Sequence, residues 1–280
     1  MRREFHDLAE LALNQEGQAW GNLGYWQTAT DYSNACCALA RILGEEAGLN
    51  SQSIVFDAGF GCGDQLLLWL NHFRVARVGG VNMSFSQTDY AKAMLDKAGF
   101  GTGAANIVQG NIDDPEAWKL AADYPAPSHV LALDCAYHFP SKAVFLQLAR
   151  HHLARSGRLA LTDFVLCSGP DAGFLAPRLL RGMLRLTHIP AANLVHPEQY
   201  RHQLQEAGFG KIRMTDISEQ VMLGFALFTK SRLRDQMPAD IRKGPRRSSR
   251  LKYWLTGHFL QWAHRRSLLR YVLISATKAD

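Results

Sequence analysis

The chain has 280 residues, 47% of them hydrophobic and 20% charged, and contains no run of the roughly 18 apolar residues that a membrane-spanning helix needs. These values predict one large soluble domain, or one domain that carries an insertion, and they exclude a disordered chain. The net charge of +6 is concentrated in residues 242–252 and 264–270, which fits a solvated basic surface, contact with an anionic lipid or substrate, or nucleic acid.

The first fifty residues are helical in pattern and predict an N-terminal helical cap over residues 1–50. Residues 1–17 place acids within their apolar pattern, which is typical of a helix and not of a signal peptide. A second helix is expected after Asp31, a good N-cap residue, with Ala35 and Leu39 near one face. Between the two helices, the aromatic and glycine-rich residues 20–26 predict a loop.

Strand-like and helical runs then alternate between residues 51 and 170. The β-rich runs are 53–59, 77–83, 106–112, 129–137 and 158–166, and the helix after the second of them is expected to be capped near Ser86. Such alternation predicts an α/β fold, in which helices cover both faces of a parallel sheet. We expect residues 51–170 to form the nucleotide-binding core.

The regular order ends near residue 170. Residues 171–217 are predicted to be a helical insertion followed by the end of the core, residues 218–266 a basic helical lid, and residues 267–280 a closing strand. The five cysteines include no C-x-x-C pair, so we expect free thiols in a reducing cytoplasm and no metal site.

A glycine-rich turn follows the first predicted strand. Residues 55–65, VFDAGFGCGDQ, carry Asp57-x-Gly59-x-Gly61-x-Gly63. A dinucleotide fingerprint needs a glycine three positions after Gly61, where this chain has Asp64, and a phosphate-binding loop needs a lysine that is absent. The pattern instead resembles motif I of the class I S-adenosylmethionine (SAM) methyltransferases. This resemblance implies a Rossmann-like α/β fold with a seven-stranded, mostly parallel sheet and helical insertions. It also implies that Asp57 and the three glycines contact SAM.

The ends of the next strands extend the resemblance. The run GVNMSFSQ is similar to the family segment that holds the ribose, which implies contacts from Asn82, Met83 and Gln87. After the third strand the resemblance implies that Asn111 and Ile112 meet the adenine, with Asp113 as the competing assignment. Both Asn82 and Asn111 stand where the family commonly has an acid. The resemblance also implies a cofactor contact from Asp134, after the fourth strand.

The loop before the core narrows the resemblance to one group of methyltransferases. The run NLGYW resembles the aromatic motif of the cyclopropane-fatty-acid synthase, sterol and tocopherol methyltransferase group. This likeness implies that Tyr25 lies over the methionine end of SAM, where its ring can also assist catalysis. The alternative is that Tyr25 and Trp26 pack the N-terminal helices together.

His138 is the main catalytic candidate. It directly follows the fourth strand, at the sheet edge where the glycine turn presents the cofactor, and a neutral imidazole can take a proton from a hydroxyl or amine. The alternatives are that His138 orients the acceptor or only shapes its loop. Acceptor contacts are expected from Tyr137, from His188 and Asn193 in the insertion, and from Trp254 in the late helix, although the stripe that holds Trp254 also fits core packing or membrane contact.

The resemblance implies a SAM-dependent methyltransferase with a small, apolar, isoprenoid- or lipid-like acceptor that is methylated at O, C or N. The enzyme rival is a nucleic-acid methyltransferase, but residues 133–137 lack the [DNS]-P-P-[YFW] pattern expected after the fourth strand. A non-catalytic SAM-binding protein is the third alternative. We expect a cytoplasmic protein, with peripheral contact between residues 242–270 and an anionic membrane as an added possibility.

Overall fold

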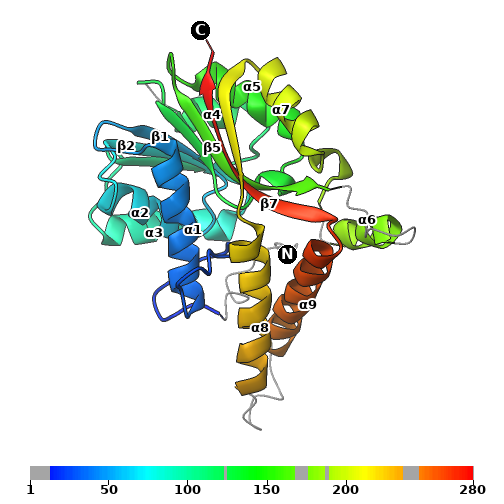
Figure 1. Cartoon of the computed structure of the whole chain (residues 1–280). Helices are drawn as coiled ribbons and strands as arrows, with labels where there is room; N and C mark the ends of the chain where they lie inside the picture. The colour runs from blue at the N-terminus through cyan, green and yellow to red at the C-terminus, as the bar shows by residue number, and fades with distance from the viewer. Residues whose placement is uncertain (1–12, 123–124, 168–175, 187–188, 236–245, 280) are drawn as a thin grey trace.

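The computed structural model describes residues 13–122, 125–167, 176–186, 189–235 and 246–279. Its centre is a seven-stranded sheet in the order β3-β2-β1-β4-β5-β7-β6 (Figure 1). The strands are β1 (Ile54–Ala58), β2 (Arg77–Asn82), β3 (Ala105–Gln109), β4 (His129–Ala132), β5 (Arg158–Leu166), β6 (Phe209–Asp216) and β7 (Leu269–Lys278). Strand β7 runs antiparallel to both of its neighbours, β5 and β6, whereas β1 to β5 pair in parallel, so the carboxyl ends of β1 to β5 share one edge.

One face of the sheet is covered by α1 (Tyr32–Ala47), α2 (Asp64–Asn71) and α3 (Phe85–Lys97). The Asp31 side chain caps α1 by accepting from the backbone N–H of Asn34, as the sequence predicts. Ser84, and not Ser86, caps α3, because its hydroxyl accepts from the backbone N–H of Gln87. The apolar sides of these helices pack with β1 and β2 in one continuous core cluster.

The other face is covered by α4 (Pro115–Ala121), α5 (Lys142–His152) and α7 (Pro197–Glu206). Trp118 of α4 is fully buried and stacks on Phe56 of β1 with ring centroids 3.9 Å apart. Ser141 caps α5 through the backbone N–H of Val144. Helices on both faces bury the central strands β1 and β4 almost completely, which explains why these two strands are mostly apolar.

The remaining elements lie around the edges of the sheet. They are the 3₁₀ turns η2 (Ala136–His138) and η4 (Ala191–Asn193), helix α6 (Ala176–Leu186), the π-helical turn η5 (Glu219–Leu223), and helices α8 (Gly224–Asp235) and α9 (Arg246–Arg265). Helices α8 and α9 pack side by side and project together from the sheet (Figure 1). None of the helices within the described ranges is long and apolar enough to span a membrane.

The fold prediction is confirmed: a mostly parallel seven-stranded sheet lies between two helical layers, and helical additions follow β5 and β6. The proposed boundaries between segments stay predictions. The first predicted helix falls mainly on residues 1–12, outside the described residues, and residues 13–17 form turns instead.

Candidate active site

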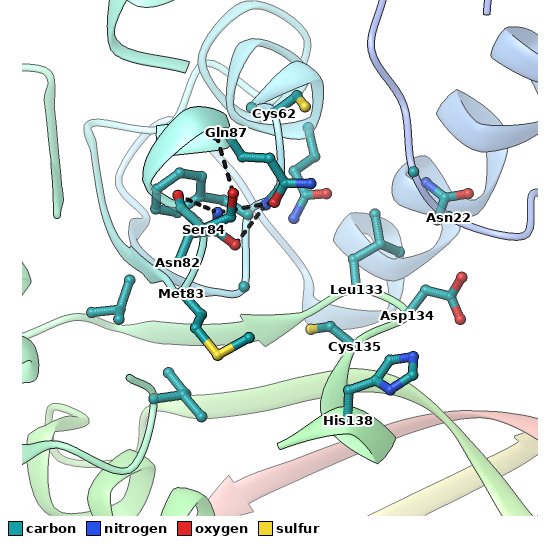
Figure 2. A pocket seen from close by; sticks show the side chains of 18 of the residues that line it. Asn22, Cys62, Asn82, Met83, Ser84, Gln87, Leu133, Asp134, Cys135 and His138 are labelled. Carbon is teal, nitrogen blue, oxygen red and sulfur yellow. Dashed lines mark hydrogen bonds between the residues drawn. The ribbon is translucent and has the colours of Figure 1, made fainter. Parts of the chain in front are cut away.

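A cavity of about 280 Å³ opens at the carboxyl ends of β1 to β4. This is the place where open α/β sheets bind their ligands, beside the point at which the strand order reverses between β1 and β4. Its walls come from residues 19–22, 59–65, 81–84, 110–112, 133–135 and 137–140, with Gln87 and Tyr253. Figure 2 shows Asn82, Ser84 and Gln87 gathered on one side of this pocket, and Asp134, Cys135 and His138 on the other.

The glycine turn forms the floor of the cavity. Gly61 has φ +58°, and a Cβ placed on it meets no atom within 4 Å, so its backbone faces open space. Gly63 has φ +94°, and there a Cβ would lie 2.8 Å from the Cβ of Ala91. Gly61 therefore leaves room for a ligand to approach the backbone, whereas Gly63 lets α2 and α3 pack closely.

Asp57 lies beneath the turn and does not line the cavity. It is fully buried and accepts hydrogen bonds from Trp69 Nε1 at 2.6 Å and Gln65 Nε2 at 2.9 Å. Burial raises the pKa of Asp57 to about 6, while these hydrogen bonds oppose the rise. The predicted direct contact between Asp57 and the cofactor is therefore replaced by a supporting position, in which its carboxylate ties α2 to the end of β1.

Polar amides line the β2 side of the cavity. Asn82 Oδ1 accepts from the backbone N–H of Gly61 at 3.3 Å, and Asn82 Nδ2 donates to Gln87 Oε1 at 3.1 Å. The Met83 side chain is 62% exposed beside them, and Ile112 is buried on the neighbouring strand end next to the exposed Asn111. Amides for hydroxyl groups and apolar side chains for a flat ring fit the ribose and adenine of a nucleoside.

The segment after β4 carries an unusual acid. Asp134 has φ +53°, a left-handed conformation that is uncommon outside glycine and that aspartate tolerates. Its Oδ1 accepts from the hydroxyls of Tyr271 at 2.6 Å and Tyr137 at 2.8 Å, and its Oδ2 accepts from the backbone N–H of Leu23 at 2.7 Å. Burial raises the pKa of Asp134 to about 6, against the effect of these three hydrogen bonds.

His138 ends the short turn η2 and lines the cavity on the β4 side. It is half-buried, and its ring centroid lies 4.5 Å from that of Tyr137. The structure therefore brings His138 and Tyr137 to the same cavity as the glycine turn, as expected for adjacent strand ends of one parallel sheet. A half-buried imidazole in a cavity wall can reach both a ligand and water.

Two other aromatic candidates are not brought into the cavity wall. The Tyr25 hydroxyl donates to Gln27 Oε1 at 2.9 Å, and its place in the wall is taken by Trp20 and Asn22. Trp254 packs against His258, with ring centroids 3.9 Å apart, and its neighbour Tyr253 lines the cavity instead. Both predictions are wrong for the same reason. Neighbouring residues of a loop or helix point their side chains in different directions, so a residue a few positions away lines the cavity instead.

Asn193 supports the loop after β4 and does not line the cavity. It is buried, and its Nδ2 donates to the backbone carbonyls of Phe139 at 2.6 Å and Tyr137 at 3.2 Å. The predicted contact with the acceptor is therefore replaced by a position that fixes the His138 turn from behind. His188, the other candidate in this insertion, lies outside the described residues.

A buried ion pair anchors the same loop. Lys142 Nζ lies 2.5 Å from Asp163 Oδ2 and donates to the backbone carbonyl of Asn193 at 2.6 Å. The Tyr200 hydroxyl donates to Asp163 Oδ2 at 2.8 Å, and Lys142 lies over the Tyr200 ring. No sequence signal marks this cluster beyond a lysine and an aspartate in otherwise apolar surroundings.

No protein-family model matches the chain. Erythromycin 3''-O-methyltransferase of Saccharopolyspora erythraea is 29% identical over 228 residues, which cover 78% of this chain and 71% of that protein. Methyltransferase GfsG of Streptomyces halstedii is 25% identical over 220 residues, which cover 78% and 75%. Mycolic acid cyclopropane synthase CmaA1, solved with SAH, has the same fold: its TM-score is 0.76 at 14% identity, over 96% of this chain and 94% of that one.

The fold, with its glycine turn at the cavity floor, is that of the class I SAM-dependent methyltransferases, and both relatives are methyltransferases. The chain is therefore a methyltransferase of the small-molecule type. The relatives thus favour the small-molecule interpretation of the sequence over the nucleic-acid alternative.

Gly61→Ala is expected to weaken SAM binding about tenfold or more without unfolding the protein. The new methyl group meets no protein atom and points into the space that the ligand needs. Titration calorimetry with SAM measures the change. Gly99→Ala is the matched control, because Gly99 also has positive φ and open surroundings but lies outside the cavity wall. An unchanged Kd in Gly61→Ala would remove the turn from the cofactor site.

Proposed function

We propose that this enzyme methylates a hydroxyl oxygen of a hydrophobic small molecule, and that His138 takes the hydroxyl proton. One observation carries the proposal: His138, at the end of β4, lines the same cavity as the glycine turn at the end of β1. Since β1 and β4 are neighbouring parallel strands, a cofactor over the turn and an acceptor beside His138 are adjacent.

The chemistry asks little of the protein beyond alignment and one proton transfer. When bound, SAM supplies a methyl group already activated by a positive sulfur. The chain has to align the acceptor oxygen, exclude water and remove its proton. A ring nitrogen of neutral His138 is suited to accept that proton, and the imidazolium can then lose it to water through the half-buried side of the ring.

The wall around His138 supports a hydrophobic acceptor. Leu133, Tyr137, Phe139 and Tyr253 line the same cavity as His138 and give it apolar and aromatic surface. The name of the S. erythraea relative states O-methylation, which agrees with a hydroxyl acceptor. Methylation at carbon is the competing proposal, because the faces of Tyr137 and Tyr253 can stabilise a cation.

The other cofactor and acceptor contacts remain proposals of the same kind. We propose that the backbone of the turn and the side chains on the β2 and β3 ends hold the cofactor: Gly59, Gly61, Gly63, Asn82, Met83, Gln87, Asn111 and Ile112. Their support is a shared position in the cavity wall.

We also propose that α8 and α9 cover the acceptor end of the cavity as a lid, because Tyr253 of α9 lines the cavity. Peripheral contact between residues 242–270 and an anionic membrane rests on charge alone.

The test uses SAM that carries an isotopically labelled methyl group. A panel of hydrophobic alcohols and glycosides is incubated with the enzyme, each beside its analogue lacking the hydroxyl, and products are analysed by mass spectrometry. We expect one labelled methyl on hydroxyl compounds and none on their deoxy partners. Label on carbon or nitrogen, with every hydroxyl compound unchanged, would overturn the proposal.

A further inference from the structure

A short segment from the N-terminal region lines the cavity and is held by two carboxylates. We call residues 19–23 the strap; residues 19–22 line the cavity. Asp64, at the start of α2, accepts from the backbone N–H of Ala19 at 3.1 Å and 3.3 Å through its two oxygens. Asp134 accepts from the backbone N–H of Leu23 at 2.7 Å. The two ends of the strap are thus tied to two different walls of the site.

Asp134 is more than one end of this attachment, because its two oxygens serve different elements. Oδ2 holds the strap, whereas Oδ1 accepts from Tyr137 of η2 and Tyr271 of β7. The Tyr271 hydroxyl also lies 2.9 Å from Thr162 Oγ1, which accepts from the backbone N–H of Asp134 at 2.8 Å. Three donors converge on one carboxyl group, and only the ionised form accepts from all of them without conflict.

Both the burial of Asp134 and its backbone conformation cost free energy. Its carboxylate is buried, and its backbone adopts a left-handed conformation directly after β4. Strained backbone of this kind persists only where the surrounding contacts hold it, and it gathers at functional sites. Here the left-handed conformation directs one carboxylate toward both the strap and the η2 turn. Figure 2 shows Asp134 on the same side of the pocket as Asn22 and His138.

We propose that Asp134 is a positioning residue that couples two parts of the site: it closes the strap over SAM, and through Tyr137 it fixes the turn that carries His138. The second half rests on the proposed function, in which His138 takes a proton. Asp64 accepts hydrogen bonds from the strap, whereas Tyr137 belongs to the turn and links it to Asp134. The three residues therefore separate the two roles.

The experiment compares Asp134→Asn, Asp64→Asn and Tyr137→Phe. Asparagine keeps the size of aspartate and tolerates the left-handed backbone, and its amide oxygen can still accept from the tyrosines. Its NH₂ group, however, would face the N–H of Leu23, donor against donor. Losing a hydrogen bond to a charged group changes an equilibrium by about ten- to hundredfold.

We expect Asp134→Asn to raise the Kd for SAM about tenfold or more and also to lower kcat at saturating SAM. Asp64→Asn should act mainly on Kd, and Tyr137→Phe mainly on kcat. Adding His138→Ala to Asp134→Asn should lower kcat by much less than it does in the parent, since both act on one step. Thermal unfolding of each variant gives the temperature range in which the comparison uses folded protein.

The Kd for SAM does not depend on which acceptor is used, so it tests the strap even if the proposed O-methylation is wrong. A folded Asp134→Asn enzyme that binds SAM as tightly as the parent overturns the strap role. Additive effects of Asp134→Asn and His138→Ala on kcat overturn the coupling. A fall in melting temperature with both constants unchanged would leave Asp134 a structural residue only.

Discussion

Replacing His138 with alanine is expected to lower kcat by about 10² to 10⁴ while the Kd for SAM changes little. The reason is positional: His138 lines the cavity beside the glycine turn, and the imidazole is the group proposed to take the proton of the acceptor hydroxyl. Steady-state kinetics at saturating SAM, with a hydroxyl acceptor from the labelling screen, measures the loss. His151→Ala is the matched control, because His151 is exposed on α5 and outside the cavity wall.

The pH dependence of kcat sharpens this prediction. A histidine base must be neutral, so the rate falls as pH drops through its pKa, which is about 6.5 for an ordinary histidine. Burial raises the pKa of Asp134 to about 6, so a second group titrates in the same range. The imidazole of His138 therefore accounts only for the part of the fall in kcat at low pH that is absent in the His138→Ala variant.

The alternatives for His138 give different results. If it only orients the acceptor, His138→Ala should raise KM for the acceptor and keep the pH limb. If it is structural, the melting temperature should fall while the folded fraction keeps both constants. A stable His138→Ala enzyme with the activity and pH profile of the parent would rule out every role considered for this residue.

Lys142→Met is expected to lower the free energy of unfolding by about 3–5 kcal/mol. The side chains of Lys142 and Asp163 are 4% and 0% exposed, so removing the ammonium group leaves a buried carboxylate without its counter-ion. Methionine is similar in size, so the effect reports charge and not a cavity. Urea unfolding, followed by the fluorescence of the buried tryptophans, measures the change.

Two variants calibrate this second prediction. Lys119→Met removes an ion pair with Glu116 whose side chains are 64% and 71% exposed, and we expect a change within about 0.5 kcal/mol. The double variant Lys142→Met, Asp163→Leu should be less unstable than Lys142→Met alone, because no buried charge is then left unpaired. A double variant that is less stable by the sum of the two single effects would show that charge compensation is not the reason.

The parts of the fold that the sequence predicts are those with local signals. Alternating strand and helix patterns, the Asp31 cap and the glycine turn each depend on a few consecutive residues. The positions of Tyr137 and His138 at the cavity were also predictable, because a residue directly after a parallel strand must lie at the carboxyl edge of the sheet.

The missed parts depend on contacts between distant residues. Asp134 meets Tyr271 across 137 positions of the chain and Leu23 across 111, and neither partner is marked by any local pattern. Asn193 resembles a pocket residue in the sequence, yet its amide is used by two backbone carbonyls 54 and 56 positions away. On α9, each residue is rotated by about 100° from the next, so predicting the lining residue within one position still selects the wrong side chain.

A crystal structure of the enzyme with S-adenosylhomocysteine bound tests the proposed site most directly. We expect the adenosine between Asn82 and Ile112, the backbone of Gly61 against the ligand, and the sulfur on the side of the cavity that carries His138. A ligand bound elsewhere, or one whose sulfur faces away from His138, would contradict it.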